Sequence, residues 1–157
     1  MISKILVALD YLADTPQIFE QALTVAEKFE ASLHIFHCVE PQLNTVPEVG
    51  AMAAYGGLLD ANTIALRERD FETGITEMSA WLQALAKQAS DRQIPVEADY
   101  KIGEPKHEIC NIAKTAGVDL VIIGRRGLSG LSEVIMGSVS SYVVHHAPCS
   151  VMVVQHQ

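Results

Sequence analysis

The sequence predicts an α/β fold, a single doubly wound, five-stranded parallel sheet with helices on both faces. Short apolar runs of strand length alternate along the chain with segments whose apolar residues recur at helical spacing. Strands that alternate with helices imply right-handed crossovers and a parallel sheet covered on both sides. The 157 residues, 49% of them hydrophobic, are enough for one core, and neither an internal repeat nor a second domain is evident.

The first half of the chain predicts two strands and a helix. Residues 5–9 form an apolar run that ends at Asp10. Asp14-Thr15-Pro16 then supplies a helix cap and a first-turn proline, and the apolar face that follows is Ile18, Ala22, Val25 and Phe29. Residues 33–39 are rich in β-branched and aromatic residues and stop before Pro41. Residues 41–62 carry Pro, Gly, Ala and Met without a clear period, so we expect a flexible connection.

The second half predicts a long helix and then three further strands. The helix extends from Thr63 to Arg92, and its apolar face consists of Phe71, Ile75, Met78, Leu82, Leu85 and Ala89. Trp81 is expected to be a packing anchor, because aromatic residues mostly supply buried area. The remaining predicted elements are a strand over 96–101, a helix over 105–116 ended by Gly117, a strand over 120–123, a helix over 138–146 and a strand over 151–154.

The charge distribution argues against two classes of partner. A net charge of −8 and a pI near 5.1 offer no basic surface to nucleic acid or to an anionic membrane. No apolar run approaches the roughly 20 residues that span a bilayer, and the first residues do not resemble a signal peptide. We therefore expect a cytoplasmic protein.

The cysteines and histidines suggest no metal site. Cys38, Cys110 and Cys149 are odd in number and lack CxxC spacing, so we expect small buried apolar residues. His145 and His146 are adjacent and point about 100° apart on a helix, which disfavours joint chelation. A contact with the end of their helix is the simpler expectation.

A glycine-containing loop carries the clearest functional signal. Gly124-Arg125-Arg126-Gly127 follows the fourth predicted strand, and Gly137-Ser138 begins a helix. Glycine lets a backbone approach a ligand, and the free N–H groups of a helix start favour an anion such as phosphate. A guanidinium in the loop is able to clamp a phosphate. Scattered glycines are also compatible with a tight surface turn, so the residues alone leave both interpretations open.

The spacing Gly-x2-Gly-x9-Gly-Ser over residues 124–138 resembles the ATP-binding signature of the universal stress proteins. The opening Lys4-Ile5-Leu6-Val7-Ala8-Leu9-Asp10 and the ending Ala147-Pro148-Cys149-Ser150-Val151-Met152-Val153-Val154 are also similar to that family, so the likeness covers nearly the whole chain. It implies one domain over residues 1–157. The implied fold is Rossmann-like, of the adenine nucleotide alpha hydrolase type, with strand order 3-2-1-4-5.

The resemblance also implies a set of nucleotide-binding residues. The set is Ala8, Asp10, Val39, Ile123, Gly124, Arg126, Gly127, Gly137, Ser138, Val139 and Ser140. Asp10 is expected near the ribose and base, the Val39 backbone at the adenine edge, and Ile123 with Gly124 beside the ribose. The residues expected to hold the phosphates are Gly127, Gly137, Ser138, Val139 and Ser140. Taken alone, Asp10 is also compatible with a solvated strand end or a local cap.

The function that the resemblance implies is a stress-response regulator that switches with bound ATP. AMP, ADP and cyclic AMP share the base and ribose and remain possible ligands, and Mg²⁺ is possible with ATP. A homodimer through Val151–Val154 and an unknown protein partner are also implied. A nucleotide-independent dimeric interaction module and a weak ATPase are the alternatives.

Three enzyme motifs are incomplete in this sequence. The stretch 127–131 lacks the second glycine of GxSxG, and Gly137-Ser138 has no P-loop lysine between its members. The glycines at 124, 127 and 130 do not form GxGxxG. We therefore expect a non-enzyme, with slow ATP hydrolysis or autophosphorylation left open.

Overall fold

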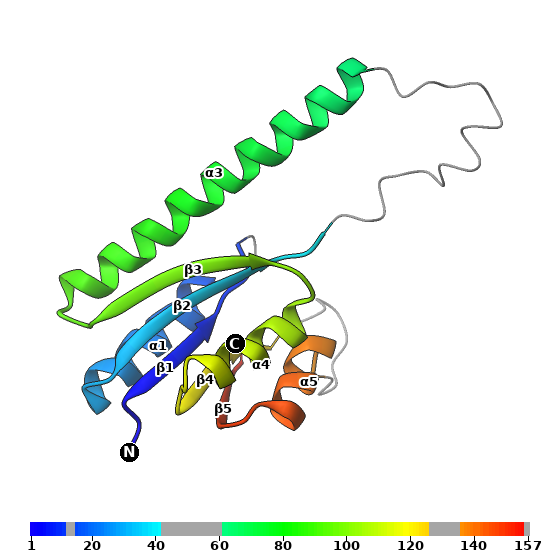
Figure 1. Ribbon diagram of the computed structural model, residues 1–157. Coiled ribbons are helices and arrows are strands. Elements are labelled where there is room, and N and C mark those ends of the chain that lie inside the picture. The colour runs from blue at the N-terminus through cyan, green and yellow to red at the C-terminus, as the bar shows by residue number, and fades with distance from the viewer. Residues whose placement is uncertain (12–14, 42–60, 126–135, 156–157) are drawn as a thin grey trace.

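The computed structural model describes residues 1–11, 15–41, 61–125 and 136–155. Its centre is a five-stranded sheet in the order β3-β2-β1-β4-β5, in which every neighbouring pair is parallel (Figure 1). The strands are β1 (Lys4–Ala8), β2 (Ser32–Val39), β3 (Val96–Ile102), β4 (Leu120–Gly124) and β5 (Ser150–Val154). The predicted fold class and strand order are confirmed, and each predicted strand lies within a residue or two of its observed bounds.

Within the described ranges, four helices cover the two faces of the sheet (Figure 1). They are α1 (Thr15–Phe29), α3 (Ala61–Asp91), α4 (Pro105–Thr115) and α5 (Ser138–His146). Alternate residues of β1 point to opposite faces, so Ile5 and Val7 pack with α1 and α3, whereas Leu6 packs with α4 and α5. The central strands β2, β1 and β4 are therefore buried on both sides, as their continuous apolar runs require, whereas the edge strand β3 is largely exposed.

The long helix α3 is only partly supported by the sheet. Its 31 residues extend for about 46 Å, whereas the seven residues of β3 extend for about 23 Å. Figure 1 shows the N-terminal part of α3 continuing past the strand ends. The second half is buried through Met78, Leu82, Leu85 and Ala89.

Two aromatic residues assigned to apolar helix faces are exposed, which corrects the prediction. The exposed fraction of Phe71 is 50%, because the first half of α3 has no sheet beneath it. That of Phe29 is 51%, at the last residue of α1. The helical spacing of these residues is correct, but periodicity does not say how far the covering sheet extends.

Helix α4 ends as its glycine predicts. Gly117 has a φ of +62°, and the N–H groups of Gly117 and Val118 donate to the carbonyls of Lys114 and Ala113 at 3.3 and 3.1 Å. This is the hydrogen-bond pattern of a Schellman motif. Helices α1 and α3 end in the same pattern, although the residues with positive φ are Glu30 and Gln93.

Asp119 joins the beginnings of β1 and β4. Its Oδ2 accepts hydrogen bonds from the N–H and hydroxyl of Ser3, both at 2.8 Å, and from the N–H of Lys4 at 3.0 Å. Its own N–H donates to the Lys4 carbonyl at 2.8 Å. These bonds fix the register at the amino end of the two central strands.

Arg92, the residue after α3, joins the end of that helix to α1. Its two terminal nitrogens each donate to a carboxylate oxygen of Glu20 at 2.9 Å.

Among the helices of the described ranges, none has both the length and the apolar character that crossing a bilayer requires.

Candidate functional site

The candidate site lies at the carboxyl edge of the sheet, where β1 separates β2 from β4. Ala8 is the last residue of β1 and pairs with Phe36 on one side and Ile123 on the other. The chain leaves β1 toward the face of α1 and leaves β4 toward the face of α5. The strand order therefore reverses between β1 and β4, which is where doubly wound folds bind ligands.

The beginning of α5 supplies free backbone donors to this edge. Gly137 is the N-cap residue, with no side-chain cap, and its carbonyl accepts the first helical hydrogen bond from Ser141 at 2.9 Å. The N–H groups of residues 138–140 precede that bond and have no intrahelical acceptor. Because α5 leads into the amino end of β5, its own N-terminus must lie at the carboxyl edge.

Ser140 and Ser138 differ in what they offer. Ser140 is buried, and its hydroxyl donates to the Gly137 carbonyl at 3.0 Å, so the backbone N–H is its free donor. The side chain of Ser138 is exposed and keeps its hydroxyl at the surface. Val139 is half-buried against the core on the α4 and α5 side. The helix start thus presents one hydroxyl and a turn of amides.

Most of the predicted residues meet at this edge. The structure places there Ala8, Asp10, Val39, Ile123, Gly124, Gly137, Ser138, Val139 and Ser140. Arg126 and Gly127 lie outside the described residues, as does nearly all of the predicted connection 41–62. The carbonyl of Val39 already accepts the N–H of Gly103 at 3.0 Å, so one lone pair remains for a ligand.

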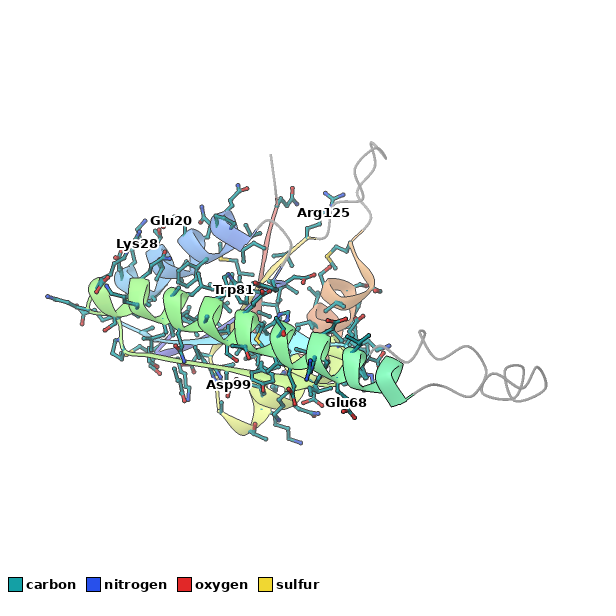
Figure 2. All side chains as sticks on the ribbon, turned by 90° about the horizontal axis from the view of Figure 1, so that it is seen from above. Glu20, Lys28, Glu68, Trp81, Asp99 and Arg125 are labelled. Carbon is teal, nitrogen blue, oxygen red and sulfur yellow. The ribbon has the colours of Figure 1, made fainter. Side chains whose placement is uncertain are left out.

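Arg125 lies at the end of β4, beside β5. Its N–H donates to the Val154 carbonyl at 2.8 Å and extends the ladder by one residue past Gly124. Its Nε is buried and has no hydrogen-bond partner within the described part of the chain. Figure 2 labels this side chain at the end of β4, well apart from Trp81. An unsatisfied guanidinium nitrogen at this edge is a donor suited to an anion.

An aromatic cluster also contacts this edge, and the sequence did not predict it. Trp81 of α3 packs against the rings of Tyr11 and His37, with ring centroids 5.1 and 5.7 Å away. Trp81 is half-buried at the core between the sheet, α1 and α3, so its role as a packing anchor is confirmed. The only sequence signal for the cluster was the position of Tyr11 directly after Asp10.

The three cysteines are free, and burial disfavours their thiolate forms. Burial, reinforced by the charges of Glu108 and Glu40, raises the pKa of Cys38 to about 11. Burial also raises the pKa of the Cys110 and Cys149 thiols. All three side chains are half-buried, which corrects the expectation of buried residues. With so little thiolate, these residues are poor nucleophiles.

The histidine pair behaves as a helix end. His146 Nδ1 lies 2.8 Å from the carbonyl of Tyr142, and the two rings stack at 3.9 Å. The predicted contact with the last turn of α5 is confirmed for His146. In the ranges that the structure covers, no three His, Cys, Asp or Glu side chains are grouped to hold a metal ion.

Similar proteins have been described in several bacteria. A universal stress protein of Synechocystis sp. is 39% identical over 156 residues, covering 98% of this chain and 97% of the relative. Universal stress protein YxiE of Bacillus subtilis is 30% identical over 156 residues, covering 99% and 100% of the two chains. The structure is similar to UspA of Lactobacillus plantarum, with a TM-score of 0.67, 25% identity and coverage of 98% and 97%.

More distant structures of the same fold contain adenine nucleotides. A universal stress protein family protein of Arabidopsis thaliana with AMP bound has a TM-score of 0.66, 21% identity and coverage of 99% and 92%. The Archaeoglobus fulgidus protein in complex with dAMP has a TM-score of 0.61, 18% identity and coverage of 98% of both chains. A universal stress protein in complex with cAMP has a TM-score of 0.59, 19% identity and coverage of 98% and 97%.

The family assignment rests on the whole chain. The profile of the universal stress protein family matches residues 1–155. The two bacterial relatives are aligned over nearly their full lengths, and the predicted strand order is the one observed. The chain belongs to the universal stress protein family.

Proposed function

We propose that this chain binds an adenine nucleotide, with ATP as the preferred ligand, and acts as a nucleotide-dependent switch in a stress response. One observation carries the proposal: the free amides of the first turn of α5 lie at the edge where β1 and β4 end. Gly137 and Ser138, the last two residues of the ATP-binding signature, begin this turn. Structures of the same fold with AMP, dAMP and cAMP support the class of ligand.

Each part of the nucleotide has a matching group. The Asp10 carboxylate is suited to accept ribose hydroxyls, and the backbone of Val39 to meet the adenine edge. Backbone N–H groups of residues 138–140, the Ser138 hydroxyl and the loop containing Gly127 are suited to phosphate oxygens. Mg²⁺ would enter with the triphosphate. We therefore assign a binding role to the site, not a catalytic one.

The available interactions are strong enough for micromolar binding. An anion at a helix N-terminus contributes about 0.3–1 kcal/mol, rising to about 2 kcal/mol when partly buried. Hydrogen bonds to charged groups contribute about 1.5–3 kcal/mol each. Several of these, together with a base site, reach the roughly −8 kcal/mol that corresponds to a micromolar dissociation constant.

Native mass spectrometry tests the proposal directly. The purified protein is measured alone and with ATP, AMP and cyclic AMP, alongside Gly127→Val and the control Gly74→Ala. Gly74 has nothing within 4 Å of an added Cβ and lies on α3, so its variant should bind like the wild type. We expect an adenine-nucleotide adduct that Gly127→Val loses. A wild type that forms no adduct would reject nucleotide binding and favour the interaction module.

The switch requires a second measurement. A nucleotide shifts a conformational equilibrium only if it binds one state more tightly. We expect ATP to slow proteolysis within 41–62 or within the loop 125–136. Equal cleavage with and without ATP would reject the switch and leave binding intact, whereas ADP accumulating over hours would favour the weak ATPase.

A further inference from the structure

Leu9, the residue before Asp10, is hydrogen-bonded to β2 through both its N–H and its carbonyl. The N–H of Leu9 donates to the Phe36 carbonyl at 2.9 Å, beyond the end of β1. The carbonyl of Leu9 accepts a hydrogen bond from His37 Nδ1 at 2.8 Å. Both partners belong to β2, and His37 is only 9% exposed. The backbone entering Asp10 is therefore fixed, and His37 must carry its proton on Nδ1.

Asp10 is followed by a residue that α3 holds. The Tyr11 ring packs against Trp81 with centroids 5.1 Å apart and an interplanar angle of 57°. The His37 ring meets the same indole edge-on, at 5.7 Å and 88°. Figure 2 shows Trp81 near the middle of α3, far from the exposed end that carries Glu68. Trp81 thus contacts Tyr11 after Asp10 and the histidine that holds Leu9 before it.

We propose that Trp81, together with His37, is a positioning residue that fixes the Asp10 carboxylate for recognition of the ribose hydroxyls. The inference rests on the proposed nucleotide site and deepens it. Contacts from β2 and α3 converge on residues 9 and 11, on either side of Asp10. Without the indole, Tyr11 loses its packing partner, and the Asp10 carboxylate is held less firmly on the Tyr11 side, although the bonds from β2 to Leu9 remain.

The test compares two nucleotides that differ only in the hydroxyls. Dissociation constants for ATP and 2′,3′-dideoxy-ATP are measured by calorimetry for the wild type, Asp10→Asn, Trp81→Leu and Trp81→Phe. One hydrogen bond to a charged group corresponds to about a 10- to 100-fold change in affinity, so Asp10→Asn should lose about that much for ATP. Trp81→Leu should lose about tenfold for ATP and less than about twofold for the dideoxy analogue. Trp81→Phe, which keeps a ring, should recover most of the loss.

Leu85→Ala is the matched control for packing. Leu85 lies one turn further along α3, is 7% exposed and belongs to the same core, but it takes no part in the contacts among the Tyr11, His37 and Trp81 rings. The Leu85→Ala variant should have a lower free energy of unfolding but the wild-type ratio of affinities for ATP and 2′,3′-dideoxy-ATP. The double variant Trp81→Leu with Asp10→Asn should bind ATP no more weakly than Asp10→Asn alone, because the indole acts through the carboxylate.

The outcomes separate this inference from the proposed function. If Trp81→Leu weakens both nucleotides equally or leaves both unchanged, the positioning role is wrong and the nucleotide site stands. A wild type that binds neither nucleotide rejects both. Should Trp81→Leu fail to fold, His37→Asn and His37→Leu replace it. Asn retains an N–H donor for the Leu9 carbonyl, so His37→Asn should keep the wild-type ratio of the ATP and 2′,3′-dideoxy-ATP dissociation constants. His37→Leu removes the donor and should change that ratio as expected for Trp81→Leu.

Discussion

At the residue scale, Asp119 shows how a single carboxylate organises two strands. The hydrogen bonds from Ser3 and Lys4 stabilise its charged form and lower its pKa below the ordinary 3.8. A carboxyl group with a lowered folded-state pKa stabilises the fold above its unfolded-state pKa, and that stabilisation disappears as the pH falls through the lowered value. The contribution is therefore full at neutral pH and is lost in acid.

The Asp119→Asn variant should be less stable than the wild type at pH 7. The uncharged amide oxygen of Asn accepts hydrogen bonds more weakly than a carboxylate oxygen, so it cannot fully replace Oδ2 as the shared acceptor of the Ser3 and Lys4 donors. The difference between the two urea midpoints should stay constant down to about pH 5 and narrow below about pH 4. A difference that is unchanged at pH 3 would show that the charge of Asp119 does not matter.

At the scale of the element, the helix ends and the one internal glycine of α3 have opposite requirements. Gly74 lies within the helix, where glycine lowers stability relative to alanine. Gly117 adopts a φ of +62°, where a side chain is strained. The same substitution should therefore have opposite effects at the two positions.

Gly74→Ala should raise the free energy of unfolding by about 0.5–1 kcal/mol, because an added Cβ meets nothing within 4 Å. Gly117→Ala should lower it by about 1–2 kcal/mol through the left-handed conformation. Urea unfolding of both variants beside the wild type measures these changes. If both substitutions changed the free energy of unfolding in the same direction, the helical conformation of Gly74 or the left-handed conformation of Gly117 would be contradicted.

At the scale of the whole molecule, the sheet has two open edges, β3 and β5. The predicted homodimer would use β5. The carbonyl of Val154 accepts from Arg125, so the backbone groups of Val154 and Met152 face β4, and those of Val151 and Val153 face outward. Unpaired outward groups at an edge are able to bind a second copy of the strand.

Val153→Pro tests this edge without removing a hydrogen bond to β4. Proline deletes the outward N–H, while the control Val153→Ala shortens the side chain and retains it. We expect light scattering at tens of micromolar to give the mass of two chains for the wild type and the control, and of one chain for Val153→Pro. A monomeric wild type would reject the dimer, and a dimeric Val153→Pro variant would show that the interface does not use this edge.

Much of the fold was predictable because its signals are local. Apolar strand runs, helical spacing and the glycine after α4 depend on neighbouring residues, and all three predicted their elements correctly. The ends of α1 and α3 carried no such signal, because Glu30 and Gln93 adopt a conformation that usually marks glycine. The exposure of Phe71 was not predictable either, because it depends on where a sheet of distant residues stops.

The candidate site was predictable only as far as its motif extends. The resemblance brought together the ends of β1, β2 and β4 with the start of α5, and the geometry places these at one edge. It gave no indication that His37 would bond to the Leu9 carbonyl, or that Trp81 would reach both His37 and Tyr11. These contacts join segments that lie far apart along the chain, and neither composition nor spacing encodes them.

The strand order has a consequence for how the chain is made. β1 lies at the centre of the sheet but is synthesised first, and β4, its neighbour on one side, begins only at Leu120. Translation adds ~5–20 residues per second, so on the order of 5–20 s pass between the synthesis of residues 5–9 and the synthesis of that neighbour. β2 and α1 are available much sooner and cover one edge and one face of β1. The nascent chain therefore exposes one flank of its central strand until β4 has been translated.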